Sequence, residues 1–220
     1  MEMLQVDVHP SEVGMDADRL GRVADFAGAF VEDGHMVGTD VLVARHGRVV
    51  LRSTAGLADR ENAVAVAGDT LWRIFSMTKP ITGMAAMMLI DEGRLGLDQP
   101  IAELLPAYAD MKVQKTYDGS ITDVVPAERP ITVRQLLTHT AGLGYNIVQK
   151  GPIAAAYTEQ GLIPGQVSRL PLPGLGRATA VKGLDVFADR LAKMPLVLQP
   201  GSKWSYSVGL DLMGRVIEVA

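Results

Sequence analysis

The chain has 220 residues, of which 48% are apolar and 21% are charged, and its formal net charge is -4. This composition is typical of a globular protein with a sizeable core and not of a disordered chain. The basic residues do not cluster, so we expect no nucleic-acid-binding surface. The absence of cysteine excludes disulfides, thiolate metal sites and a cysteine nucleophile.

Targeting signals are not expected either. The opening residues, "MEMLQVDVHPSEVG", contain no basic stretch and no apolar run of the kind found in a signal peptide. No segment approaches the ~18 uninterrupted apolar residues of a transmembrane helix. The sequence therefore predicts a soluble cytoplasmic protein without a membrane partner.

The N-terminal part predicts one helix followed by a hairpin. Asp16 is a suitable N-cap for a helix that runs to about Glu32, because apolar residues recur behind it at helical spacing. Two segments rich in β-branched residues follow, and a tight turn at His46–Gly47 joins them.

The rest of the chain predicts mainly helices. We expect a helix over 77–93 that stops at Gly93, a short helix capped by Asp98, a helix capped by Thr132 and ended by Gly142, a helix capped by Asp185, and a last helix after Tyr206. Met84, Met87, Met88 and Leu89 are predicted to anchor the first of these helices in the core.

Two segments, 111–130 and 144–183, predict irregular insertions. The first is polar, and the second is rich in proline and glycine. A loop as long as the second is more often functional or mobile than merely connecting. Its proline-rich part, "LPLPGLG", is interpreted either as a lid over a site or as a tolerated surface insertion.

Ser76 and Lys79 are the first candidates for chemistry. They are three residues apart at the start of a helix and therefore lie on one face. A serine hydroxyl becomes a good nucleophile when a neighbouring group takes its proton, and a neutral lysine can do so. Pro80 is tolerated in the first turn, where backbone N–H groups have no helical partner. The alternative is a serine N-cap beside a solvated lysine.

The segment "FSMTKPITGMAAMMLIDEGRLGLDQPI", followed by "ITVRQLLTHTAGL", resembles the serine beta-lactamase/penicillin-binding-protein superfamily. The likeness is greatest to class C beta-lactamases and family VIII carboxylesterases and covers their N-terminal half. It implies an α+β fold of the beta-lactamase/transpeptidase type, with a helical region and an antiparallel sheet. It also implies that Ser76 is the acylated nucleophile and that Lys79 activates it.

A third motif of that superfamily, Tyr-x-Asn, is similar to "YSV" at 206–208. The resemblance makes Tyr206 the tyrosine that shuttles protons to and from the serine oxygen. Val208 stands where beta-lactamases carry an asparagine that contacts the substrate amide, so it favours esters over beta-lactams. By analogy with the esterases, Tyr145 lines the substrate pocket; the alternative is a loop tyrosine that covers a helix end.

Other catalytic patterns are less well supported. His139 is not expected to be a base, because "LLTHTAGL" resembles a structural turn of the superfamily and a histidine there more often satisfies backbone groups. The sequence lacks the G-x-S-x-G pattern of α/β-hydrolases and the H-E-x-x-H pattern of zinc proteases. We therefore expect no metal and no organic cofactor.

The resemblance also predicts that 1–220 form an incomplete domain, with a helix and hairpin over 15–75 and a mainly helical region over 76–220. Members of the superfamily are longer, and their C-terminal half supplies most of the sheet and one oxyanion-hole N–H. A sheet with few strands leaves an open pairing edge. We therefore expect a fragment of a longer protein, a complementing C-terminal fragment as partner, or a homo-oligomer.

The sequence as a whole predicts a serine hydrolase that cleaves small carboxylic esters through an acyl-enzyme. The alternatives are a beta-lactamase or D-amino-acid peptidase, an acyltransferase in which an alcohol replaces water, and a non-catalytic binding domain of the same fold. The expected ligand in the enzymatic cases is a small ester or a beta-lactam.

Overall fold

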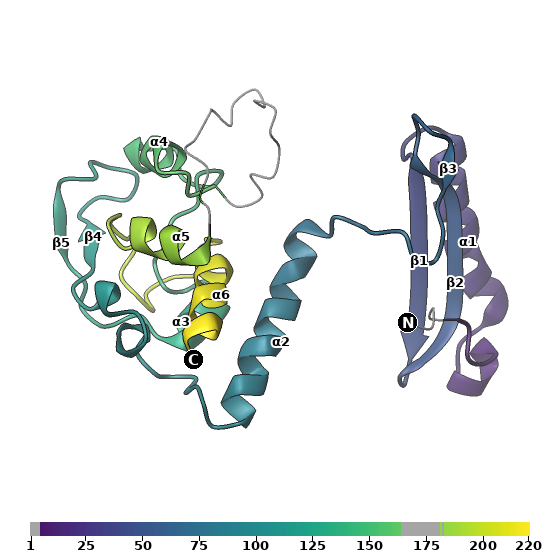
Figure 1. Ribbon diagram of the computed structural model, residues 1–220, viewed down its shortest axis with the longest axis horizontal. Helices are drawn as coiled ribbons and strands as arrows, with labels where there is room; N and C mark the ends of the chain where they lie inside the picture. Colours follow the sequence, from purple (N-terminus) through teal and green to yellow (C-terminus); the bar gives the residue numbers. More distant parts are fainter. Residues whose placement is uncertain (1–4, 164–180, 182) are drawn as a thin grey trace. The chain divides into compact units, whose positions relative to one another are not determined.

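The computed structural model describes residues 5–163, 181 and 183–220, and the chain forms two compact units, Met1–Arg73 and Ile74–Ala220 (Figure 1). Each unit has its own hydrophobic cluster. The segment "LPLPGLG" lies outside the described residues.

In the first unit, a helix covers one face of an antiparallel sheet whose strand order is β1-β2-β3 (Figure 1). Its elements are η1 (Pro10–Val13), α1 (Ala17–Glu32), β1 (Gly38–Arg45), β2 (Arg48–Asp59) and β3 (Val64–Ala65). The Asp16 side chain accepts a hydrogen bond from the Arg19 N–H at 2.9 Å and caps α1, as predicted. A small cluster of buried residues fixes the helix to the sheet: Val8, Val13, Leu20 and Val50.

The turn between β1 and β2 lies at His46–Gly47, where it was predicted. His46 has a φ of 53° and Gly47 a φ of 75°, so both residues adopt the left-handed conformation. Two-residue hairpin turns with two positive φ angles match the right-handed twist of the strands they join. The register between the strands shifts between Val43 and Ala44.

The second unit surrounds a larger core with short helices and one antiparallel pair of strands. Its elements are η2 (Phe75–Met77), α2 (Thr78–Asp91), η3 (Ile101–Glu103), η4 (Pro106–Tyr108), β4 (Lys112–Gln114), β5 (Val124–Pro126), α3 (Val133–Leu137), α4 (Pro152–Glu159), α5 (Leu184–Leu191) and α6 (Gly209–Val219). Helices and antiparallel strands in one chain confirm the predicted α+β class.

The packing of α2 differs from the prediction. Ala86 is the buried residue of this helix, whereas Met84, Met87 and Met88 are 61%, 49% and 59% exposed. Apolar residues surround α2 on all sides, so the side that packs against α6 covers only some of them. Leu89 does contact the core, and the predicted stop at Gly93 is confirmed by its φ of 70°.

Two predicted helix caps are wrong. Asp98 does not cap η3, because its carboxylate pairs with Arg134 from α3. Asp185 lies inside the first turn of α5, and the N-cap is Gly183.

The two segments expected to be irregular contain regular structure. The segment 111–130 carries the paired strands β4 and β5, with Val113 and Gln114 buried. The segment 144–183 carries α4, whose Ile153 and Tyr157 pack into the core.

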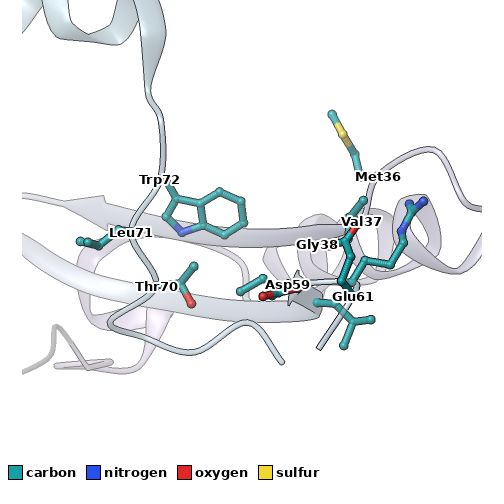
Figure 2. Close-up of a pocket in the computed structure, with 11 residues that line it drawn as sticks. Met36, Val37, Gly38, Asp59, Glu61, Thr70, Leu71 and Trp72 are labelled. Atoms are coloured by element: carbon teal, nitrogen blue, oxygen red, sulfur yellow. The ribbon is translucent and has the colours of Figure 1, made fainter. Parts of the chain in front are cut away.

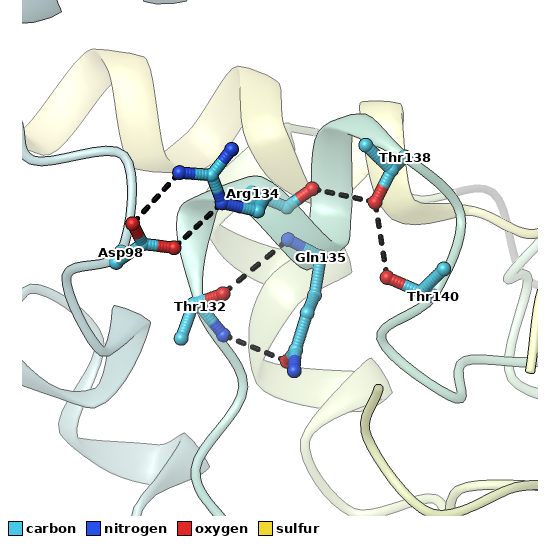
Figure 3. A network of polar contacts seen from close by, with 6 residues as sticks. All are labelled: Asp98, Thr132, Arg134, Gln135, Thr138 and Thr140. Carbon is cyan, nitrogen blue, oxygen red and sulfur yellow. Dashed lines mark hydrogen bonds and ion pairs between the residues drawn. The ribbon is translucent and has the colours of Figure 1, made fainter. Parts of the chain in front are cut away.

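The helix at Thr132 begins as predicted but ends early. Thr132 and Gln135 form a capping box, in which each side chain accepts a hydrogen bond from the other residue's backbone N–H (Figure 3). The helix α3 ends at Leu137 rather than near Gly142, because His139 turns into the left-handed conformation with a φ of 55°.

Candidate active site

Ser76 and Lys79 lie at the entrance to α2. Ser76 belongs to the short helical turn η2, and Lys79 belongs to the first turn of α2. The Lys79 Nζ donates a hydrogen bond to the Ser76 Oγ at 3.2 Å. Ser76 is exposed, and Lys79 is partly exposed.

Tyr206 reaches the same point from the segment that precedes α6. Its Oη lies 3.1 Å from the Ser76 Oγ, and the Lys79 Nζ lies 5.0 Å from the centre of its ring. The ammonium of Lys79, followed by the hydroxyl of Ser76, holds the pKa of the Tyr206 phenol below its usual value. One serine oxygen is thus within hydrogen-bonding distance of an amine and an acidified phenol.

Two aromatic side chains flank the Tyr206 ring. The His139 ring lies 4.7 Å from it between centroids, and the Tyr145 ring lies 5.5 Å from it. Burial, with a smaller contribution from the Lys79 charge, lowers the pKa of His139. Burial raises the pKa of Tyr145, so its phenol stays neutral at physiological pH. The structure therefore brings Tyr145 beside Tyr206.

Asp211 adds a negative charge to this group. It lies in the first turn of α6, where burial raises the pKa of its carboxyl and the charge of Lys79 opposes that shift. In turn, the Asp211 charge raises the pKa of Tyr206 slightly. The electrostatic balance at Ser76 thus includes a cation on α2 and an acid on α6.

Val208 is placed differently from the other candidates. Its side chain is completely buried in the core of the second unit. Its N–H donates a hydrogen bond to the Gly144 carbonyl at 3.2 Å, which joins the segment before α6 to the segment after α3. No asparagine amide is present at this position.

The backbone next to Ser76 is strained. Phe75 has a φ of 45°, a left-handed conformation that side chains other than glycine rarely adopt. Such a residue costs about 1–3 kcal/mol and is found most often at functional sites. The observation supports a functional interpretation of the segment that carries Ser76.

The sequence pointed to Ser76 and Lys79 by their spacing and to Tyr206 through the family resemblance. It also predicted that His139 satisfies backbone groups, and the His139 Nδ1 does accept a hydrogen bond from the Ser207 N–H. It did not point to Asp211. Asp211 follows Tyr206 by five residues, at the first turn of a predicted helix, and that placement could have identified it. The stacking of His139 on Tyr206 joins residues 67 positions apart, for which the sequence contains no local signal.

A hollow lies in the first unit, and Ser76 is not among the residues that line it. It has a volume of about 670 Å³ and is lined by residues 36–38, 57–61 and 70–72 (Figure 2). Asp59 on its wall accepts two hydrogen bonds from Asn62, which lower the pKa of its carboxyl. Its acid is therefore engaged locally, and the hollow contains no nucleophile paired with a base.

Within the described residues, no group of three or more His, Cys, Asp or Glu side chains is arranged to hold a metal ion. In the same part of the chain, no helix has both the length and the apolar character needed to cross a bilayer.

A model of the family described as Beta-lactamase matches residues 23–220. The chain belongs to the beta-lactamase family. This membership and the similar solved structures confirm the predicted resemblance and the beta-lactamase-like fold.

Proteins described as an esterase, a hydrolase and a synthase are among those similar to this chain. Esterase EstB of Burkholderia gladioli is 35% identical over 99% of this chain and 50% of its own length. The structure of EstCE1, described as a hydrolase with promiscuous acyltransferase activity, is 32% identical, has a TM-score of 0.70, and is matched over 91% of this chain and 47% of its own. Simvastatin synthase (LovD) from Aspergillus terreus is 26% identical with a TM-score of 0.64, over 93% of this chain and 48% of its own. The chain thus spans about half the length of these relatives.

Proposed function

We propose that the protein is a serine hydrolase that cleaves small carboxylic esters through an acyl-enzyme formed on Ser76. The proposal depends most on one observation, namely that the Ser76 Oγ lies 3.2 Å from the Lys79 Nζ and 3.1 Å from the Tyr206 Oη. A nucleophile within hydrogen-bonding reach of a base, which is oriented in turn by a third group, is the arrangement that activates a hydroxyl. The names of esterases among the relatives support the same reaction class.

The direction of the hydrogen bonds suggests how the proton moves. Lys79 donates to the Ser76 Oγ, so the hydrogen of Ser76 is free to point toward the Tyr206 oxygen. The depressed pKa of Tyr206 favours the phenolate, which is the form that accepts a proton. Tyr206 is therefore proposed as the general base, and Lys79 as the cation that stabilises the phenolate and orients the hydroxyl.

The proposed reaction has two halves. In the first, the Ser76 proton passes to Tyr206, the Oγ attacks the ester carbon, and collapse of the tetrahedral intermediate expels the alcohol, which takes the proton from Tyr206. In the second, a water molecule gives a proton to Tyr206 while the water oxygen attacks the acyl carbon. The carboxylic acid then leaves and Ser76 recovers the proton.

Esters are proposed over beta-lactams because of the residue at 208. Val208 has no amide side chain and is buried, so it cannot provide the hydrogen bonds that an asparagine gives to a substrate amide. Tyr145, beside Tyr206, is proposed to line the pocket for the acyl or alcohol group.

Acyl transfer is the second candidate function. The description of EstCE1 names a promiscuous acyltransferase activity, and LovD is described as a synthase. If an alcohol enters in place of water, the same two half-reactions yield a new ester. Adding an alcohol during ester turnover distinguishes the two, because a transferase releases the new ester as well as the acid.

The proposed function is tested by locating the acylated residue. The full-length protein is incubated with a p-nitrophenyl ester, a chromogenic cephalosporin and a fluorophosphonate, and adducts are identified by mass spectrometry. We expect rapid ester turnover and an adduct on Ser76, with both lost in Ser76→Ala and kept in Ser120→Ala, an exposed serine near β5. Faster turnover of the cephalosporin than of the ester would favour a lactamase. If no serine is labelled, the proposal is wrong and a non-catalytic domain is favoured.

A further inference from the structure

His139 contacts the residues on both sides of Tyr206. Its carbonyl accepts a hydrogen bond from the Ser205 N–H at 2.9 Å. Its ring Nδ1 lies 3.2 Å from both the Ser207 N–H nitrogen and the Ser207 Oγ. The tyrosine is thus held between two neighbours that are themselves bonded to one histidine.

The same histidine packs on the tyrosine ring itself. The His139 and Tyr206 rings are inclined at 34° with centroids 4.7 Å apart. The Trp204 ring meets the His139 ring edge-on, with centroids 6.2 Å apart. The phenol that these contacts direct is the group whose oxygen lies 3.1 Å from the Ser76 Oγ. A displacement of about 1 Å in a reacting group can cost 10²-fold in rate, so such support has a large effect on catalysis.

The contact with Ser207 determines the protonation state of the ring. A backbone N–H can only donate, so Nδ1 must be an acceptor and the imidazole must carry its proton on Nε2. The Ser207 Oγ accepts a hydrogen bond from the Gly209 N–H and has its own hydrogen available for Nδ1. The neutral ring thereby links the tyrosine segment to the start of α6.

His139 also has a backbone conformation that few residues accept. Its φ of 55° is in the left-handed region, where asparagine is the side chain best tolerated after glycine. Asparagine places an oxygen acceptor two bonds beyond Cβ, close to the position of Nδ1 in histidine. The chain therefore offers a conservative replacement that keeps both the backbone and the acceptor.

We propose that His139 is a positioning residue, whose neutral ring holds the Tyr206 phenol against Ser76 and Lys79. This inference rests on the proposed function, since it assigns the support of the proposed base. His139 does not exchange a proton with the substrate. It acts by accepting a hydrogen bond from the Ser207 N–H and by stacking on the Tyr206 ring.

The first test measures the pKa of Tyr206 directly and does not depend on turnover. Full-length protein labelled with ¹³Cζ-tyrosine is titrated by NMR, with the Tyr206 signal assigned from Tyr206→Phe. In wild type we expect a pKa below the usual ~10. His139→Asn should keep this low value, and His139→Ala should move it toward ~10. Equal Tyr206 pKa values in wild type and His139→Ala would overturn the proposal.

The second test compares ester turnover by the same variants. We expect kcat to fall ~10–100-fold in His139→Ala with little change in KM, and to fall much less in His139→Asn. His46→Ala is the matched control, since His46 is also a histidine in the left-handed conformation, in the turn between β1 and β2. Its kcat should equal that of wild type. If His139→Asn loses as much activity as His139→Ala while both remain folded, the acceptor has no such role.

A third measurement covers the case in which His139→Ala fails to fold. The ¹⁵N shifts of the wild-type His139 ring should show an unprotonated Nδ1 and a protonated Nε2 at neutral pH. The opposite tautomer would overturn the proposal without any variant. Failure of the proposed function looks different, because wild type would then take no probe and turn over no ester while the Tyr206 pKa still followed the His139 variants.

Discussion

The helices α2 and α3 are held in different ways; Lys79 lies in the first turn of α2, and His139 follows the end of α3. No side chain caps α2 in the described part of the chain, and Ala86 is its one buried residue. The much shorter α3 has a capping box at Thr132 and two buried residues, Val133 and Leu136. The comparison teaches that Ser76 is presented on a lightly held segment, whereas His139 follows a firmly fixed one.

Side-chain hydrogen bonds also hold α3 near both of its ends. Arg134 binds Asp98 through two hydrogen bonds of 2.6 and 2.7 Å, and the Thr138 hydroxyl donates to the Arg134 carbonyl at 2.8 Å (Figure 3). The hydroxyl oxygens of Thr138 and Thr140, which flank His139 in the sequence, are hydrogen-bonded at 3.0 Å. These hydrogen bonds thus hold α3 near its start and its end, whereas Ser76 is exposed.

The largest expected effect is a loss of activity on substitution of Lys79 in α2. Lys79→Met should lower the kcat of ester hydrolysis ~10²–10⁴-fold, because it removes the group that orients Ser76 and acidifies Tyr206. Lys79→Arg should not restore the rate, because a guanidinium is planar, larger than an ammonium and presents its donors in a fixed fork. Stability should hardly change, because Lys79 is partly exposed and is not one of the residues by which α2 contacts the core. The exposed Lys193 at the end of α5 provides the control, as Lys193→Met should retain full activity.

An intermediate effect is expected from the cap of α3. Thr132→Ala should reduce the free energy of unfolding by about 1 kcal/mol, since it removes the side-chain acceptor of the capping box. Thr132→Ser keeps that oxygen and should retain most of the stability. Denaturant unfolding of the two variants and wild type measures the difference. Equal stability of Thr132→Ala and wild type would show that α3 is not held by its cap.

The smallest effect concerns the charge on α6. Asp211→Asn removes a negative charge that raises the pKa of Tyr206, so this pKa should fall further. The acidic limb of the pH profile of kcat/KM, where the phenolate is lost, should therefore shift to lower pH by less than about one unit. Asp189→Asn, at an exposed position of α5, should leave the profile unchanged. A shift to higher pH in Asp211→Asn would contradict the assignment of Tyr206 as the base.

Local signals predicted the parts of the fold that depend on neighbouring residues. The caps at Asp16 and Thr132 and the turn at His46–Gly47 were predicted because each depends on residues within one turn of chain. The spacing of Ser76 and Lys79 is equally local. The assignment of Tyr206 required the family resemblance, since 130 positions separate it from Ser76.

The features that could not be predicted depend on distant partners. The carboxylate of Asp98 is occupied by Arg134, 36 residues away, which removed the predicted cap. The methionines of α2 have the hydrophobicity of core residues, but one neighbouring helix cannot cover every side of an apolar helix. The strands β4 and β5 have three residues each, too few for a periodic pattern.

The distance in sequence between Ser76 and Tyr206 has a consequence during translation. A ribosome adding ~5–20 residues per second takes about 7–26 seconds to make the 130 residues from Ser76 to Tyr206. Throughout that interval the nascent polypeptide carries its hydroxyl and amine without the phenol that would complete them. Under the proposed mechanism, a half-made chain is harmless to the esters around it, and reactivity begins only when translation has passed codon 206.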